Sequence, residues 1–181
     1  MKLYPKGDYF AHLSSLYGEQ GNETRQLLTL EAAYDGGYLS KQNQYLALGS
    51  LLLSSDVPYK SAKVLTEGME KKIVEDSVTN LRLLAQAWLL AQEPHEAIKV
   101  LQKAAKKSDD GELYVRLGQS YADLDEWKDC ISSIREGLKK GDLEREDSAN
   151  VTLGVCLYNN NDLDGAIAAF TRARKDERSR K

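Results

Sequence analysis

The sequence predicts an all-α protein built from repeated helix pairs. Apolar residues recur at three- and four-residue spacings, which is the period of an α-helix, and only 3 prolines interrupt the chain. No long segment alternates with period two, or is rich enough in Val, Ile and Thr, to predict a strand. A pattern of large and small residues returns about every 33 to 36 residues, which indicates a repeat architecture.

Each copy of the pattern has large, large, small and large residues on a first helix, then small, large and small residues on a second. The copies, in chain order, are Phe10, Leu13, Ser14, Tyr17 with Gln26, Leu30, Ala33; Tyr45, Leu48, Gly49, Leu52 with Ser61, Leu65, Gly68; Leu81, Leu84, Ala85, Trp88 with Ala97, Leu101, Ala104; Tyr114, Leu117, Gly118, Tyr121 with Cys130, Ile134, Gly137; and Asn150, Leu153, Gly154, Leu157 with Ala166, Phe170, Ala173. The first copy is the weakest, because Gln26 stands where the others have a small residue.

Glycine occupies the small position of the first helix in three copies, as Gly49, Gly118 and Gly154. Glycine inside a helix costs up to about 1 kcal/mol relative to alanine, so its recurrence needs a packing reason. We expect these glycines to lie where the two helices of a pair cross, with Gly118 facing Cys130.

The repeated residues resemble the tetratricopeptide repeat family, whose signature has an aromatic residue, Leu-Gly and Tyr on the first helix and Ala, Phe and Ala on the second. The resemblance implies a right-handed superhelical solenoid of about five helix pairs, forming a single array over residues 1–181. The repeats are expected near 7–41, 42–77, 78–110, 111–146 and 147–181. The family's proline near the end of each repeat is absent, and Gly141 and residues 108–111 supply breaks instead.

Composition excludes several classes of function. The 181 residues are 41% hydrophobic and 29% charged, as in ordinary soluble proteins, and the net charge of −3 makes nucleic acid an unexpected partner. The apolar runs are too short for membrane insertion. Residues 1–10 lack the apolar core of a secretory signal, so we expect a periplasmic location if a signal has been removed, and a cytoplasmic one otherwise.

Candidate metal sites are weak. Residues 160–165 imitate the start of a calcium loop, but Thr171 stands where that loop needs a bidentate Glu, so we expect an ordinary turn between helices. His12 and His95 have no carboxylate or cysteine at ligand spacing. We therefore expect no metal.

Neither the cysteines nor any sequence motif predicts a chemically active site. Cys130 and Cys156 are expected to be buried hydrophobic residues, since cysteines inside helices seldom meet the geometry of a disulfide. No phosphate-binding loop, nucleophile elbow or zinc-protease motif occurs, so we expect neither a cofactor nor enzymatic activity.

In tetratricopeptide proteins the first helices line a concave surface, and the resemblance therefore implies a peptide-binding groove. Its residues in this chain are Asn43, Leu46, Ser50, Leu53, Arg82, Gln86, Leu89, Glu112, Arg116, Gln119, Asp123, Val151, Tyr158 and Asn159. The same mapping adds Asp8, Ala11, Ser15, Thr79, Val115, Ala122, Ser148 and Val155. Arg82, Gln86 and Arg116 match only part of the set with which some relatives hold a partner's C-terminal carboxylates, so we do not expect such a clamp.

The predicted function is a non-catalytic scaffold or adaptor that binds a protein or peptide. Residues 84–88, 109–121 and 173–180 also resemble bacterial periplasmic repeat proteins encoded beside TonB, ExbB and ExbD-type components, which implies a role in envelope transport. Two alternatives stay open, namely a regulatory or targeting module of a larger enzyme and a self-assembly element. A helix over about 163–175 would leave Ile167 and Ala169 partly exposed or covered by a second molecule, which predicts either a weak homodimer through the last repeat or a truncated cap.

Overall fold

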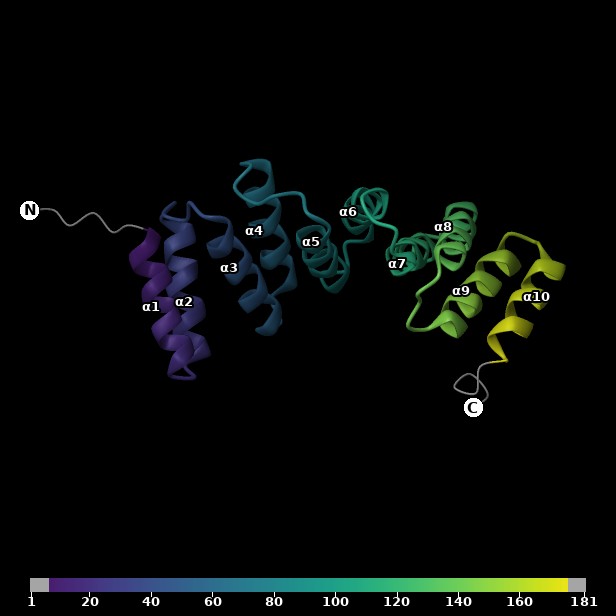
Figure 1. The fold of residues 1–181 in the computed structure, drawn as a ribbon, viewed down its shortest axis with the longest axis horizontal. Helices are drawn as coiled ribbons and strands as arrows, with labels where there is room; N and C mark the ends of the chain where they lie inside the picture. The colour runs from purple at the N-terminus through teal and green to yellow at the C-terminus, as the bar shows by residue number, and fades with distance from the viewer. Residues whose placement is uncertain (1–6, 176–181) are drawn as a thin grey trace, which may run out of the picture. The chain divides into compact units, whose positions relative to one another are not determined.

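The structure is a computed structural model, and it describes residues 7–175. Residues 1–6 and 176–181, which include part of the segment considered for a signal and most of the charged C-terminal end, lie outside the described residues. Within residues 7–175 the chain forms helices and no strand (Figure 1). The helices are α1 (Gly7–Glu19), α2 (Glu23–Asp35), α3 (Gln42–Ser54), α4 (Pro58–Glu70), α5 (Val78–Leu90), α6 (Pro94–Lys106), α7 (Gly111–Ala122), α8 (Trp127–Lys140), α9 (Glu146–Asn159) and α10 (Leu163–Ala173).

The chain divides into two compact units, residues 1–91 and 92–181, which we call the N-terminal and C-terminal units. In the N-terminal unit α1 packs on α2, α3 on α4, and α4 on α5. In the C-terminal unit α7 packs on α8, α8 on α9, and α9 on α10, and α9 also contacts α7. Within each unit, helices that are neighbours in sequence therefore pack together, as a repeat architecture requires.

The turns inside the helix pairs share one backbone feature. A residue with positive φ recurs at Gly21, Asp56, Gln92, Asp125 and Asn161, always just after the first helix of a pair. Asn161 belongs to the segment that imitates a calcium loop, and Asp162 caps α10 by accepting a hydrogen bond from the Gly165 N–H. This segment is therefore the expected turn, and the helix that follows it excludes a calcium loop.

Close packing within a pair explains the recurring glycines. A Cβ atom added to Gly49 would lie 2.7 Å from Cδ2 of Leu65, and one added to Gly154 would lie 2.5 Å from Cε1 of Phe170. At Gly118 the added atom would lie 2.6 Å from Cδ1 of Ile134. The contacted residue is always 16 positions further on, so the helix crossing is the same in each pair. The prediction that Gly118 faces Cys130 is only partly right, because Cys130 contributes just its carbonyl oxygen, at 3.2 Å.

Each unit has its own apolar core. The core of the N-terminal unit includes Leu30, Tyr45, Leu48 and Leu52, and that of the C-terminal unit includes Cys130, Ile134, Leu153 and Leu157, among other residues. The residues named here all belong to the repeated pattern, but the two cores also include residues outside it, such as Val64 and Ala149, so the pattern encodes only part of the core. Ile167 on α10 is 64% exposed, but Ala169 is 1% exposed, so the expectation of an exposed Ala169 is wrong.

Candidate functional site

The predicted groove residues from Asn43 to Asn159 lie on first helices of pairs, namely α3, α5, α7 and α9, except Asp123, which directly follows α7. None of them is buried except Val115, which is 4% exposed and therefore does not line a groove. They fall into two sets, one in each unit, so we describe two faces. Asn43 to Leu89 lie on the α3–α5 face, and Glu112 to Asn159 lie on the α7–α9 face.

The α3–α5 face mixes polar and half-buried apolar residues. Asn43, Ser50, Arg82 and Gln86 are exposed, whereas Leu46, Leu53 and Leu89 are half-buried. Beside it, Gln42 Oε1 accepts a hydrogen bond of 2.7 Å from the Glu75 backbone N–H, which ties the start of α3 to the segment before α5. The α3–α5 face therefore offers a ligand little apolar surface, because its three leucines are already half-buried.

The α7–α9 face has a polar half and an apolar half. On α7, Glu112 and Arg116 form an ion pair with a nitrogen-to-oxygen distance of 3.6 Å. Gln119 follows on the same helix, and Asp123 comes directly after its end. On α9, the exposed apolar residues are Val151, Val155 and Tyr158, with exposed fractions of 41%, 41% and 61%. We call these three residues the α9 stripe. Their spacing of four and three residues places them on one side of the helix.

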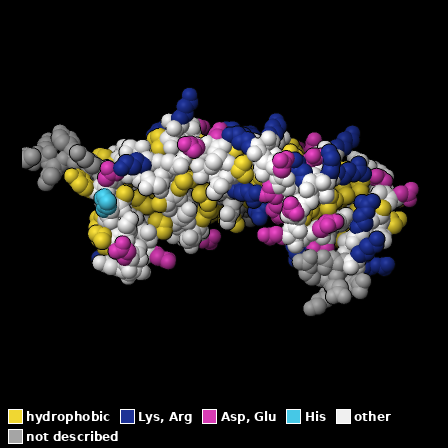
Figure 2. All heavy atoms as spheres, in the orientation of Figure 1, with side chains coloured by type: hydrophobic (Ala, Val, Ile, Leu, Met, Phe, Trp, Pro, Cys, Tyr) yellow, Lys and Arg dark blue, Asp and Glu magenta, His cyan; other side chains and the backbone are white. Residues whose placement is uncertain are grey.

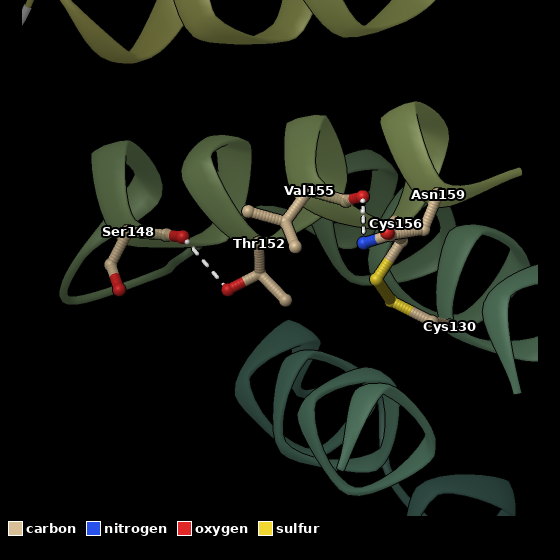
Figure 3. Close-up of a disulfide and its surroundings, with 6 residues drawn as sticks. All are labelled: Cys130, Ser148, Thr152, Val155, Cys156 and Asn159. Atoms are coloured by element: carbon tan, nitrogen blue, oxygen red, sulfur yellow. Dashed lines mark hydrogen bonds between the residues drawn. A yellow bond between two sulfur atoms is a disulfide. The ribbon is translucent and has the colours of Figure 1, made fainter. Parts of the chain in front are cut away.

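Two polar residues beside the α9 stripe donate hydrogen bonds to backbone carbonyl oxygens of α9 itself (Figure 3). The Thr152 hydroxyl donates to the Ser148 carbonyl oxygen at 3.2 Å, and Asn159 Nδ2 donates to the Val155 carbonyl oxygen at 3.0 Å. Because these groups already have partners, the chemistry that α9 offers a ligand on this side is mainly apolar contact.

A disulfide joins Cys130 of α8 to Cys156 of α9, with a Cα–Cα distance of 6.3 Å (Figure 3). Both residues are fully buried, as predicted, but the expectation that they are unbonded is wrong. Cys130 lies near the start of α8 and Cys156 near the end of α9, so antiparallel packing brings the two side chains together. Sequence spacing could not reveal this, because it depends on how two helices from different repeats pack.

Tyr34, Glu67 and Lys71 form a hydrogen-bonded cluster in the N-terminal unit. The Tyr34 hydroxyl on α2 donates to Glu67 on α4, which also accepts from Lys71 Nζ. The hydrogen bond from Lys71, then that from Tyr34, lowers the pKa of the Glu67 carboxyl. Burial, then the hydrogen bond to Glu67, raises the pKa of Tyr34. The cluster ties two pairs together and lies away from the first-helix faces.

The described part of the chain gives no support for a metal site or a membrane-spanning helix. Residues 7–175 contain no group of three or more His, Cys, Asp or Glu side chains placed to hold a metal ion. Across the same residues, the helices are all too short or too polar to cross a membrane. Figure 2 shows basic and acidic side chains interspersed on the visible face, with hydrophobic atoms between them.

Solved structures resemble the chain in fold at low sequence identity. The MamA protein matches with a TM-score of 0.76 at 16% identity, over 96% of this chain and 93% of that one. Residues 41 to the end of MamA from Desulfovibrio magneticus RS-1 match with a TM-score of 0.73 at 17% identity, over 99% of both chains. YrrB, described as a TPR protein with an unusual peptide-binding site, matches with a TM-score of 0.75 at 14% identity, over 94% of this chain and 87% of that one.

No family model and no curated protein matches the sequence. At such identities the structural likeness establishes the fold, which is an all-α helical repeat of the tetratricopeptide type. The predicted fold class is therefore confirmed.

Proposed function

We propose that the protein is a non-catalytic interaction scaffold that binds an apolar segment of a partner protein on its α7–α9 face. The observation that carries the proposal is the α9 stripe, a row of exposed Val151, Val155 and Tyr158 beside hydrophilic groups that are already paired. Exposed rows of apolar residues on a rigid surface are typical of peptide-binding sites. The peptide-binding site named for YrrB, a neighbour in fold, also supports this proposal.

A peptide library selected on the immobilised protein tests the function. We expect selected peptides to share apolar residues, and Val155→Glu to weaken their binding by about tenfold or more, because a charge would be buried against apolar side chains. The matched control is Leu90→Glu on α5, where an exposed leucine lies outside the α7–α9 face. Peptides that bind both variants as well as the unaltered protein would place the site elsewhere, and Arg82→Ala with Gln86→Ala would then test the α3–α5 face.

We also propose that the protein is located in an oxidising compartment, which in a bacterial cell is the periplasm. The buried disulfide supports this, since disulfides persist mainly outside the cytosol. Counting free thiols in the denatured protein, isolated from its host under conditions that block thiol exchange, tests the compartment. Two free thiols without reductant would contradict it.

The link to TonB-type transport remains a proposal that rests on sequence resemblance, and none of the neighbours named above bears on it. A module of a larger enzyme is the second candidate from the sequence, and no feature of residues 7–175 favours it. Purification of the protein with its partners from the native host distinguishes the two, because each predicts a different class of partner.

A further inference from the structure

The first and last described helices, α1 and α10, expose apolar residues at positions that are buried in the middle of the chain. On α10, Ile167 is 64% exposed, whereas Ile131, its counterpart 36 residues earlier on α8, is 7% exposed. Phe170 is 40% exposed, and its counterpart Ile134 is fully buried. Ile131 and Ile134 belong to one cluster with residues of α9. Phe170, like Ile134, also meets the glycine of its own pair's first helix. The side of α10 that carries Ile167 therefore corresponds to the side of α8 that carries Ile131.

Helix α1 carries the complementary surface. The residues through which α9 joins the cluster with α8 include Ala149, Leu153 and Cys156, which are at most 3% exposed. Their counterparts 140 residues earlier are Tyr9, Leu13 and Leu16, with exposed fractions of 59%, 42% and 53%. Thus α1 presents three large apolar side chains at the positions by which α9 packs on α8.

Within the chain, surfaces of these two kinds meet in the interface between α8 and α9. We propose that α1 of one molecule packs on α10 of a second molecule as α9 packs on α8, so that the protein self-associates head to tail. A second copy is the occupant that the chain itself supplies, since each molecule carries both halves. The proposal does not depend on the peptide-binding function.

A head-to-tail interface is heterologous, meaning that two different surfaces meet. Two variants that each have one different surface blocked should therefore associate with each other although neither associates with itself. We expect the mass of the unaltered protein in sedimentation equilibrium to rise with concentration. Ile167→Glu blocks the α10 surface and Leu16→Glu blocks the α1 surface, so each variant alone should be monomeric. An equimolar mixture should form a one-to-one dimer and nothing larger, because one unblocked surface of each kind remains.

The mixture separates this arrangement from a symmetric dimer. If α10 packed on α10, Leu16→Glu would associate like the unaltered protein and the mixture would gain nothing. That result, or an unaltered protein that stays monomeric throughout, would overturn the proposal. Leu90→Glu is the matched control, since Leu90 is 56% exposed and lies on α5, and it should leave association unchanged. Circular dichroism checks that each variant is folded, and Leu13→Glu replaces Leu16→Glu if the latter is not.

The native disulfide provides a second measurement that also tests the register. Ala166 is the counterpart of Cys130 and Leu16 that of Cys156, so the proposed packing places residues 166 and 16 of two molecules about as far apart as the bonded pair, whose Cα–Cα distance is 6.3 Å. Mixing Ala166→Cys and Leu16→Cys proteins under mild oxidation should give a covalent dimer that reductant separates. Association without this cross-link would refute the proposed packing, and each variant oxidised alone serves as the control.

Discussion

Replacing Gly118 with leucine tests whether close helix crossing is the reason for the recurring glycines. The first side-chain carbon would lie 2.6 Å from both Cγ1 and Cδ1 of Ile134, and 3.2 Å from the Cys130 carbonyl oxygen. Carbon atoms normally approach to about 3.5–4.0 Å, so the overlap is about 1 Å before the rest of the leucine is placed. Ile134 is fully buried, so a shift that relieves the clash must also move its packed neighbours.

The size of the effect follows from two opposing contributions. Overpacking a core costs typically about 1–3 kcal/mol, and leucine at this site belongs at the upper end because three more carbons follow the one that clashes. Leucine also improves helix propensity over glycine by about 1 kcal/mol. We therefore expect the free energy of unfolding to fall by about 2 kcal/mol, measured by urea denaturation followed by circular dichroism. Ser132→Leu on the exposed side of α8 is the control, with an expected change within about 0.5 kcal/mol.

A double-mutant cycle identifies the contact itself. Ile134→Ala alone should cost about 2–5 kcal/mol, because it leaves a cavity. In the presence of Gly118→Leu the cavity is filled, so the double variant should be more stable than the sum of the single changes by about 1 kcal/mol or more. Additive effects, or an unchanged stability for Gly118→Leu, would refute the assignment of this crossing.

Three further predictions address the disulfide, the Glu67 cluster and the break after α8. Replacing both Cys130 and Cys156 with serine should reduce the free energy of unfolding by about 3 kcal/mol for a separation of 26 residues, and reductant should produce a similar loss only in the unaltered protein. Because the folded-state pKa of Glu67 is lowered, its contribution to the free energy of unfolding is present at neutral pH and is lost as the pH falls below about 4.3. Tyr34→Phe should therefore reduce the free energy of unfolding by about 1 kcal/mol at pH 7 and by less in acid, measured by urea denaturation at each pH. Gly141→Ala should cost about 1–3 kcal/mol in thermal unfolding, because φ is 77° and ψ is −158° at this residue, a conformation that side chains disfavour, and an unchanged melting temperature would contradict that reason.

The sequence alone determined the features that repeat locally. The spacing of apolar residues predicted helices, and Gly49, Gly118 and Gly154 marked where they cross, because one periodic pattern encodes both the buried side of a helix and its close contacts. The helix pairs begin at Gly7, Gln42, Val78, Gly111 and Glu146. The single array, its repeat bounds and the groove residues stay predictions.

Only the tertiary structure decided which residues from different repeats meet and which have no neighbour. Cys130 and Cys156 are bonded because α8 and α9 pack antiparallel, and the positions of the two cysteines in the sequence do not specify that approach. Ile131 and Ile167 are the same residue type at the same place in the pattern, yet one is buried and the other is exposed. The physical reason is that burial of a repeated position depends on whether another helix lies against it, which the position's own sequence does not contain.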